Sequence, residues 1–188
     1  MSALTREQWL NAALLHVARR IADKTDSQLP VDCRVSVGFP GGGSARKRIG
    51  ECWPRARSAD KVNEIFISPV LREPAQMLDV LVHEAIHAVD DCQHGHKAAF
   101  KQLATAVGLV GKMTATSAGP ALQVWIADTL KALPPLTHGA LSLDGRTKQG
   151  TRMLKLECAD CGYTVRTTAK WLDMGTPTCC CGGDMVQA

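Results

Sequence analysis

Long hydrophobic runs are missing from this chain of 188 residues, and its first residues lack the basic-then-apolar pattern of a secretion signal. A membrane-spanning helix needs about 20 consecutive apolar residues, and a signal peptide needs a cationic stretch before a shorter apolar one. The two absences predict a cytoplasmic protein that has no membrane partner. Hydrophobic residues still make up 45% of the chain, which is enough to build a core and argues against wholesale disorder.

A strong excess of either charge is also missing, since 22 Lys and Arg face 18 Asp and Glu for a net charge of +4. This balance permits nucleic-acid binding without requiring it. The basic residues are densest at Arg46, Lys47 and Arg48, which we take as a candidate nucleic-acid contact. An ordinary solvated loop explains the triplet equally well. DNA is therefore a candidate partner, and nothing in the sequence bears on the oligomeric state.

Hydrophobic periodicity predicts an α+β fold in which a small antiparallel sheet packs on helices. The expected helices cover residues 5–23, 74–91, 97–107 and 121–133, and the expected strands cover residues 33–39, 49–53 and 63–71. Pro134 and Pro135 end the last helix, and a Gly- and Thr-rich stretch follows them. We therefore expect a main domain over residues 1–135, a linker over 136–152 and a small second domain over 153–188.

The helix expected over residues 74–91 contains the sequence His83-Glu84-Ala85-Ile86-His87. Two histidines four residues apart share one helix face, so they can bind one metal ion together. Glu84 is offset from them by about 100°, from where its carboxylate can reach a metal-activated water as a general base. Burying such residues in an apolar helix is costly unless a bound metal compensates. The pattern predicts a catalytic zinc with His83 and His87 as ligands and Glu84 as the catalytic residue.

A third ligand must come from elsewhere, because a catalytic zinc usually has three protein ligands and one open position. Glutamate is absent between Glu84 and Glu157, which excludes a Glu on the next helix. Asp91 faces the same side, but it lies about 6 Å farther along the axis than His87, so it suits a supporting role better. His94 and His96 remain, and Gly95 between them lets the chain reverse. Residue type alone does not choose between the two.

The chain resembles the SprT-like (Spartan-type) zinc metallopeptidases in its His-Glu-x-x-His sequence followed by Gly95-His96 and by Phe100-Lys101. The resemblance includes residues 49–52, 64–69, 108–109 and 113–116, and so covers much of residues 5–133. In that family the histidine after the glycine is the third zinc ligand, which implies His96, with His94 in a supporting or substrate-contacting role. The resemblance also implies a zincin-like domain followed by a zinc ribbon.

Tyrosine is almost absent, and the only one, Tyr163, lies in the C-terminal segment. A tyrosine that stabilises the developing oxyanion is therefore not expected in the main domain. The donor would be the zinc itself, His94, His138, an arginine or a backbone N–H.

Cysteine is concentrated at the C-terminal end, where five of the eight cysteines lie. Two cysteine turns, each followed by glycine, predict a zinc ribbon with a structural zinc. The expected ligands are Cys158, Cys161, Cys179 and Cys181; Cys180 is left spare because adjacent cysteines converge poorly on one ion. Cys33, Cys52 and Cys92 are scattered along the chain and are expected to be small core or surface residues.

These observations predict a zinc metalloendopeptidase that hydrolyses peptide bonds in a protein substrate. In eukaryotic relatives the substrates are proteins crosslinked to DNA, so DNA-associated proteins are candidates. The alternative is a nucleic-acid-binding accessory protein with a structural or inactive metal centre. The presence of Glu84 favours the enzyme, because a purely structural site has no need of it.

Overall fold

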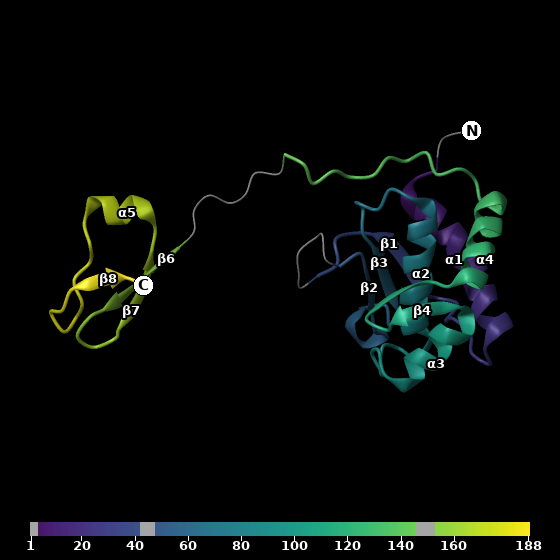
Figure 1. The fold of residues 1–188 in the computed structure, drawn as a ribbon, viewed down its shortest axis with the longest axis horizontal. Helices are drawn as coiled ribbons and strands as arrows, with labels where there is room; N and C mark the ends of the chain where they lie inside the picture. Colours follow the sequence, from purple (N-terminus) through teal and green to yellow (C-terminus); the bar gives the residue numbers. More distant parts are fainter. Residues whose placement is uncertain (1–3, 42–47, 146–152) are drawn as a thin grey trace. The chain divides into compact units, whose positions relative to one another are not determined.

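The computed structural model describes residues 4–41, 48–145 and 153–188, and the chain divides into two compact units, residues 1–142 and 143–188 (Figure 1). Both units combine helices with small sheets, so the predicted α+β class is confirmed. Within the described ranges, no helix has the length and hydropathy that a bilayer crossing demands.

The first unit contains a three-stranded sheet made of β1 (Arg34–Val37), β2 (Gly50–Trp53) and β3 (Glu64–Ile67). Its spatial order is β1-β3-β2, so β2 is an edge strand. β2 and β3 pair antiparallel, but β1 and β3 pair parallel, and the prediction of an antiparallel sheet is wrong for this pair. The reason is topological: β3 enters between β1 and β2 instead of continuing beyond β2, and so runs in the direction of β1.

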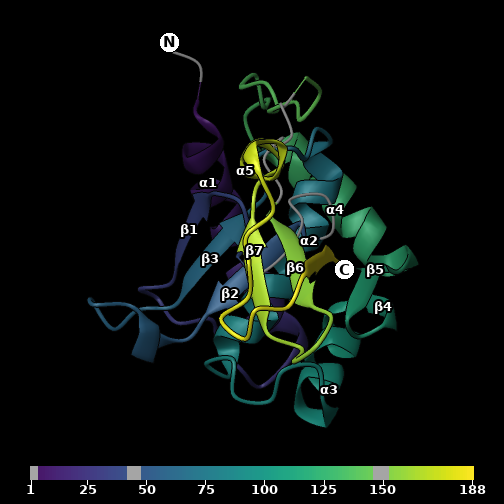
Figure 2. The same ribbon diagram turned by 90° about the vertical axis from the view of Figure 1, so that its left-hand side faces the viewer.

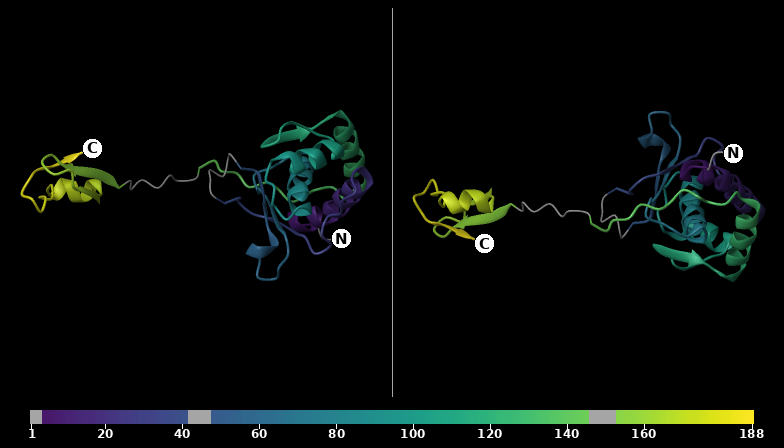
Figure 3. Two further views of the ribbon diagram at one scale, coloured as in Figure 1. Left: turned by 90° about the horizontal axis from the view of Figure 1, so that it is seen from below. Right: turned by 90° about the horizontal axis from the view of Figure 1, so that it is seen from above.

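The four helices of this unit lie on one side of the sheet, where the first two contact its strands and the other two pack against the second helix (Figures 2 and 3). They are α1 (Arg6–Lys24), α2 (Pro74–Val89), α3 (Ala98–Val107) and α4 (Pro120–Ala132), and they correspond to the four predicted helices. α1 begins with the predicted capping box, in which Thr5 and Gln8 each bond the other's backbone N–H. Gly108 ends α3 in the left-handed conformation that favours glycine.

α2 is the central helix, since it contacts β2, β3 and the other three helices of the first unit. Pro74 occupies its first turn, where the missing N–H costs nothing. Ten of its sixteen residues are buried, including Leu78, Leu81 and Ile86, which are fully inaccessible. This burial anchors the helix in the core and fixes the positions of the polar side chains that it carries toward the surface.

A β-hairpin that the sequence analysis missed follows α3 and consists of β4 (Leu109–Lys112) and β5 (Ala115–Ala118). The two strands pair antiparallel around Met113 and Thr114. Its strands contain glycine, lysine and several small residues, so the alternation of large apolar and polar residues that announces a strand is absent.

The chain beyond α4 stays attached to the first unit up to Ser142, seven residues past the expected domain boundary at 135. Arg6, although only 3% exposed, donates from its guanidinium to the carbonyls of Leu71 and Gly139. The Trp9 indole donates to the Pro134 carbonyl at 3.0 Å. These bonds join the start of α1 to the segment after α4. That segment has no periodic pattern of apolar residues from which the attachment could be predicted.

The second unit contains a three-stranded sheet and a short helix, α5 (Ala169–Met174). Its strands are β6 (Leu154–Cys158), β7 (Thr164–Thr167) and β8 (Met185–Gln187), in the antiparallel order β7-β6-β8. The core is small and consists of Leu156, Cys158, Cys179 and Met185, with Val165 and Leu172 packed against it. So little apolar burial rarely holds a domain of this size together without a metal or a disulfide.

Candidate metal centres

Three imidazoles of the first unit converge at one point on the surface of α2. His83 and His87 lie one turn apart on α2, and the Nε2 atom of each is 3.2 Å from Nε2 of His96. The three ring nitrogens lie within 4.8 Å of one another, so the group could hold a metal ion. The structure thus brings His96 to His83, thirteen residues earlier in the sequence, and to His87, nine residues earlier.

The turn after α2 decides which histidine joins the cluster. Asp91, Cys92 and Gly95 all adopt positive φ angles, of 53°, 60° and 50°, and the chain reverses there within a few residues. His94 turns to the carboxylate of Asp90, with 3.1 Å between Nδ1 and Oδ2, while His96 faces the cluster. The choice that residue type left open is therefore made by backbone geometry.

Asp91, the residue expected in a supporting role, bonds to residues of other elements and not to the histidines. Its Oδ1 accepts the backbone N–H of Arg55 at 2.7 Å and the side-chain amide of Asn63 at 2.8 Å. These bonds hold the turn after α2 against η1 (Arg55–Arg57) and β3. Asp91 therefore shapes the loop that carries His96.

Two residues from other elements support the imidazoles. Phe100 of α3 is fully buried and stacks on the His87 ring, with 4.3 Å between centroids and 27° between planes. Thr116 of β5 places its hydroxyl oxygen 2.7 Å from His83 Nδ1. When Nδ1 carries the proton, it donates to Thr116 and leaves the Nε2 lone pair facing the cluster. Both residues were noticed only as parts of the family motif, and no local spacing indicates these contacts.

The cluster is electrically suited to a cation because its imidazoles stay neutral. Burial, and then the charges of the neighbouring histidines, lower the pKa of His83 to about 3. Burial and His96 lower the pKa of His87 to about 4, and burial also lowers the pKa of His96. Neutral imidazole is the form that binds metals, so each of these side chains can offer a nitrogen lone pair to a metal ion at neutral pH.

Glu84 lies beside the cluster in a tightly enclosed position. It is only 7% exposed, and burial, reinforced by the charge of Glu51 and opposed by Arg48, raises its pKa to about 8. β2 approaches closely here, because a Cβ at Gly50 would lie 2.6 Å from Glu84 Oε1 and 2.5 Å from Val80 Cγ1. Only a glycine lets the strand lie against this part of α2.

A cavity of about 870 Å³ opens over Glu84 and the three histidines. One wall is formed by β2 and the residues before it, and the opposite wall is formed by residues 114–117 of the hairpin. Arg48 lines the β2 side, where its guanidinium is 2.6 Å from Glu51 Oε1 and 2.9 Å from the Gly41 carbonyl. Of the basic triplet, Arg46 and Lys47 lie outside the described residues, so only Arg48 can be located.

Two of the cysteines that are scattered along the sequence are neighbours in the structure. The sulfur atoms of Cys52 on β2 and Cys92 on the turn after α2 lie 3.4 Å apart, and both residues line the same cavity. The hydrogen bond to Cys92, and then burial, raise the pKa of the Cys52 thiol. The sequence did not indicate this pair, because residues forty positions apart meet only in the folded chain.

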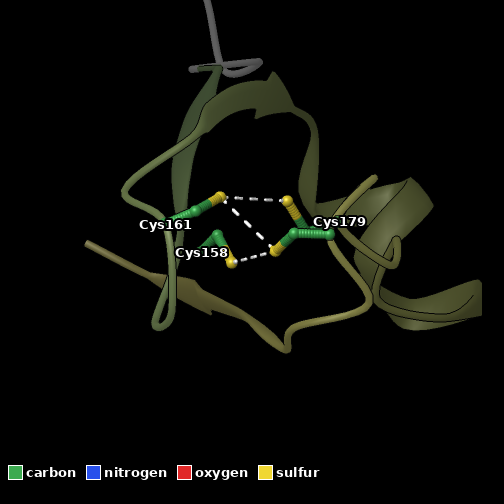
Figure 4. Close-up of side chains that lie close together, drawn as sticks. Cys158, Cys161 and Cys179 are labelled. Atoms are coloured by element: carbon green, nitrogen blue, oxygen red, sulfur yellow. Dashed lines mark hydrogen bonds between the residues drawn. The ribbon is translucent and has the colours of Figure 1, made fainter.

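The second unit brings four thiols together (Figure 4). The Cys158–Cys181 and Cys161–Cys179 sulfur pairs are both separated by 3.5 Å, too far for a disulfide at about 2.05 Å. These four thiols form a second group that could hold a metal ion, whereas Cys180 is outside it and exposed. Backbone N–H groups of Cys161 and Asp160 lower the pKa of Cys158 to about 7, which favours the thiolate form that metals bind.

No protein-family model, curated protein or solved structure matches this chain.

Proposed function

We propose that this protein is a zinc-dependent metalloendopeptidase of the SprT-like type, with a zincin-like first unit and a zinc ribbon as its second. The observation that carries the proposal is the position of Glu84, buried in one cavity with three converging neutral imidazoles. A purely structural zinc site is usually closed by four protein ligands. The three-histidine group leaves one ligand position to water or substrate.

The spacing of the donor atoms fits zinc at both sites. Tetrahedral zinc with Zn–N bonds of 2.0–2.1 Å separates its nitrogens by about 3.3 Å, and the histidine nitrogens that approach His96 are 3.2 Å from it. Zn–S bonds of 2.3 Å imply sulfur separations of about 3.8 Å, close to the 3.4–3.5 Å among Cys158, Cys161, Cys179 and Cys181. The four-cysteine site would be structural and the three-histidine site catalytic.

The roles of the residues follow from their surroundings. His83, His87 and His96 would hold the zinc, which when bound supplies the Lewis acidity that makes a water acidic near neutral pH. Glu84 would accept a proton from the attacking water and pass it to the leaving amine. Its burial prepares it for this task, because a raised pKa brings a carboxylate closer to the pH at which it must both accept and release a proton.

The walls of the cavity fit a peptide in extended form. β2 is an edge strand, so its outer backbone edge can pair with another chain, except at the Cys52 carbonyl, which accepts from the Cys92 thiol. It lines the cavity directly over Glu84. A substrate strand along β2 would bring its backbone to the metal centre, which suits flexible segments of proteins better than folded ones.

The second unit favours a nucleic-acid contact, and this observation keeps the alternative function open. Tyr163 and Trp171 are 56% and 55% exposed, and the Lys170 amine lies 5.0 Å from the Trp171 ring. Exposed aromatic rings next to cations are typical of surfaces that stack the bases of single strands. We propose that the ribbon contacts DNA, which would direct the peptidase to DNA-associated proteins.

Substituting Glu84→Gln tests the function. The variant keeps the shape of the side chain but cannot move a proton, so we expect zinc content to be unchanged while cleavage of denatured casein falls at least about 100-fold. Wild-type protein with two zinc ions per chain that cleaves no protein, with or without DNA, would refute the peptidase. The DNA contact is tested by mobility shift of a single-stranded oligonucleotide, where binding should weaken steeply with salt.

A further inference from the structure

A second cavity of about 320 Å³ lies beside the proposed metal centre, between α2, β5 and α4. This volume is at the lower end of the range found for ligand pockets, about 300–1,000 Å³. Most of its lining is apolar, and the apolar residues are Ala75, Ala118, Ile126, Ala127 and Leu130. The cavity is therefore a concave and mainly apolar surface.

The two cavities adjoin each other. Gln76, Asp79 and Ser117 line both of them. Asp79 precedes His83 by one helical turn, and Ser117 follows Thr116, whose hydroxyl contacts His83 Nδ1. The second cavity therefore begins within about one helical turn, or 5.4 Å, of a proposed zinc ligand. In a peptide whose scissile bond lies at the metal centre, the side chains next to that bond would lie at about this distance from the zinc ligands.

Two of the four polar residues around the second cavity bond to the protein's own backbone. The carboxyl group of Asp79 accepts the Ala118 N–H, although its Oδ1 is buried without a hydrogen-bond partner among the described residues, and burial raises its pKa. The side-chain amide of Gln123 donates to the Ala118 carbonyl at 2.9 Å. What the cavity offers a ligand is mainly the surface of Ile126, Ala127 and Leu130 from α4.

We propose that the second cavity is a specificity subsite that receives a large apolar side chain, aliphatic or aromatic, from a substrate residue next to the scissile bond. The proposal rests on the peptidase function and names its substrate class: flexible protein segments with a hydrophobic residue at one fixed position relative to the cut. Its position next to the metal-centre cavity identifies the occupant, since a peptide bound over Glu84 can project a side chain toward this surface.

The test uses the full-length zinc-loaded protein and denatured casein as the first substrate. Mass spectrometry of the fragments shows which residues flank the cleaved bonds. Quenched-fluorescence peptides are then built around the most cleaved bond, with Leu, Phe, Gly or Lys at each flanking position in turn. We expect Leu and Phe to raise kcat/KM over Gly by about 10- to 200-fold at one position, the usual discrimination of an apolar pocket.

Two variants locate the effect in the structure. Ala127→Trp fills the cavity from the exposed side of α4, so it should reduce the Leu-to-Gly ratio to less than about 5-fold while cleavage of the Gly peptide is retained. Leu130→Gln makes the floor polar and should lower the ratio in the same direction. Ala121→Trp, the same substitution at an exposed α4 position outside the cavity, should leave the ratio unchanged.

The outcomes separate this proposal from the function on which it rests. If the wild-type protein cleaves neither casein nor any peptide, the peptidase function and the subsite both fail. If it cleaves peptides without an apolar preference, or prefers Lys, the peptidase stands and the subsite is wrong. An apolar preference that survives both Ala127→Trp and Leu130→Gln also overturns the proposal, because the preference then arises elsewhere.

Discussion

The contact between Thr116 and His83 predicts that a residue outside the proposed ligand set controls zinc affinity. The hydroxyl oxygen of Thr116 is 2.7 Å from His83 Nδ1, in a part-buried position. Thr116→Val replaces the hydroxyl by a methyl group of similar size, so the ring keeps its packing but loses its partner. His83 can then adopt the other tautomer or rotate, and both changes turn the Nε2 lone pair away from the metal.

The size of the effect follows from what is lost. A buried donor left without a partner costs about 1–3 kcal/mol. Loss of a group that orients a ligand typically lowers metal affinity 10–100-fold, which corresponds to about 1.4–2.8 kcal/mol. We therefore expect Thr116→Val to weaken zinc binding at the three-histidine site by 10–100-fold, with Thr116→Ser close to wild type because it retains the hydroxyl.

Competition with a chromophoric zinc chelator measures this directly, and the four-cysteine site serves as an internal reference in every variant. Thr114→Val is the matched control, because Thr114 is exposed on the same hairpin and lines the same cavity. The reasoning is refuted if Thr116→Val binds zinc as tightly as wild type, or if Thr116→Ser is as weak as Thr116→Val. The second result would mean that packing rather than the hydroxyl matters.

Three further predictions concern the close packing, the proton and the ribbon. Gly50→Ala places a methyl group against Glu84 and should destabilise the first unit by about 1–3 kcal/mol; Gly139→Ala meets no neighbour within 4 Å and should be neutral in thermal unfolding. In metal-free protein, the pKa of Glu84 is raised to about 8, so the folded state holds more protons than the unfolded state from about pH 4.5 to 8 and loses stability as the pH rises through this window. Relative to Glu84→Gln, wild type should lose on the order of 3 kcal/mol between pH 5.5 and 8.5 in urea titrations, and parallel pH profiles would contradict this. Cys158→Ala should lower the zinc content from two ions to one and unfold the second unit, whereas Cys180→Ala should change neither, as judged by metal analysis and near-ultraviolet circular dichroism.

Features that depend on neighbours in sequence were predictable. The helix over residues 74–89 follows from its apolar periodicity, and helical geometry alone places His83 and His87 on one face with Glu84 beside them. The capping box at Thr5 and the paired cysteine turns of the second unit are equally local. In each case the residues involved are close together in the sequence, so local backbone geometry alone determines how they lie in the structure.

Features that depend on contacts between distant segments were decided only by the tertiary structure. The choice of His96 over His94 requires a reversal through three positive φ angles, and neither residue type nor spacing encodes its direction. Thr116 reaches His83 from a hairpin whose strands lack an alternating pattern. Its partner lies thirty-three residues away, so only the packing of β5 against α2 brings them together.

The same division explains the sheet and the second cavity. Strand propensity indicated where β1 and β3 lie, but their parallel pairing arises because β3 enters between two earlier strands, which no local signal specifies. Residues Gln76, Ser117 and Ile126 line one cavity from three separate elements. The sequence alone determined the helix that carries His83, Glu84 and His87. The tertiary structure determined the rest of the site, because it depends on contacts between distant residues: the turn that brings in the third histidine, the hairpin that supports His83, and the cavity walls formed by β2, β5 and α4.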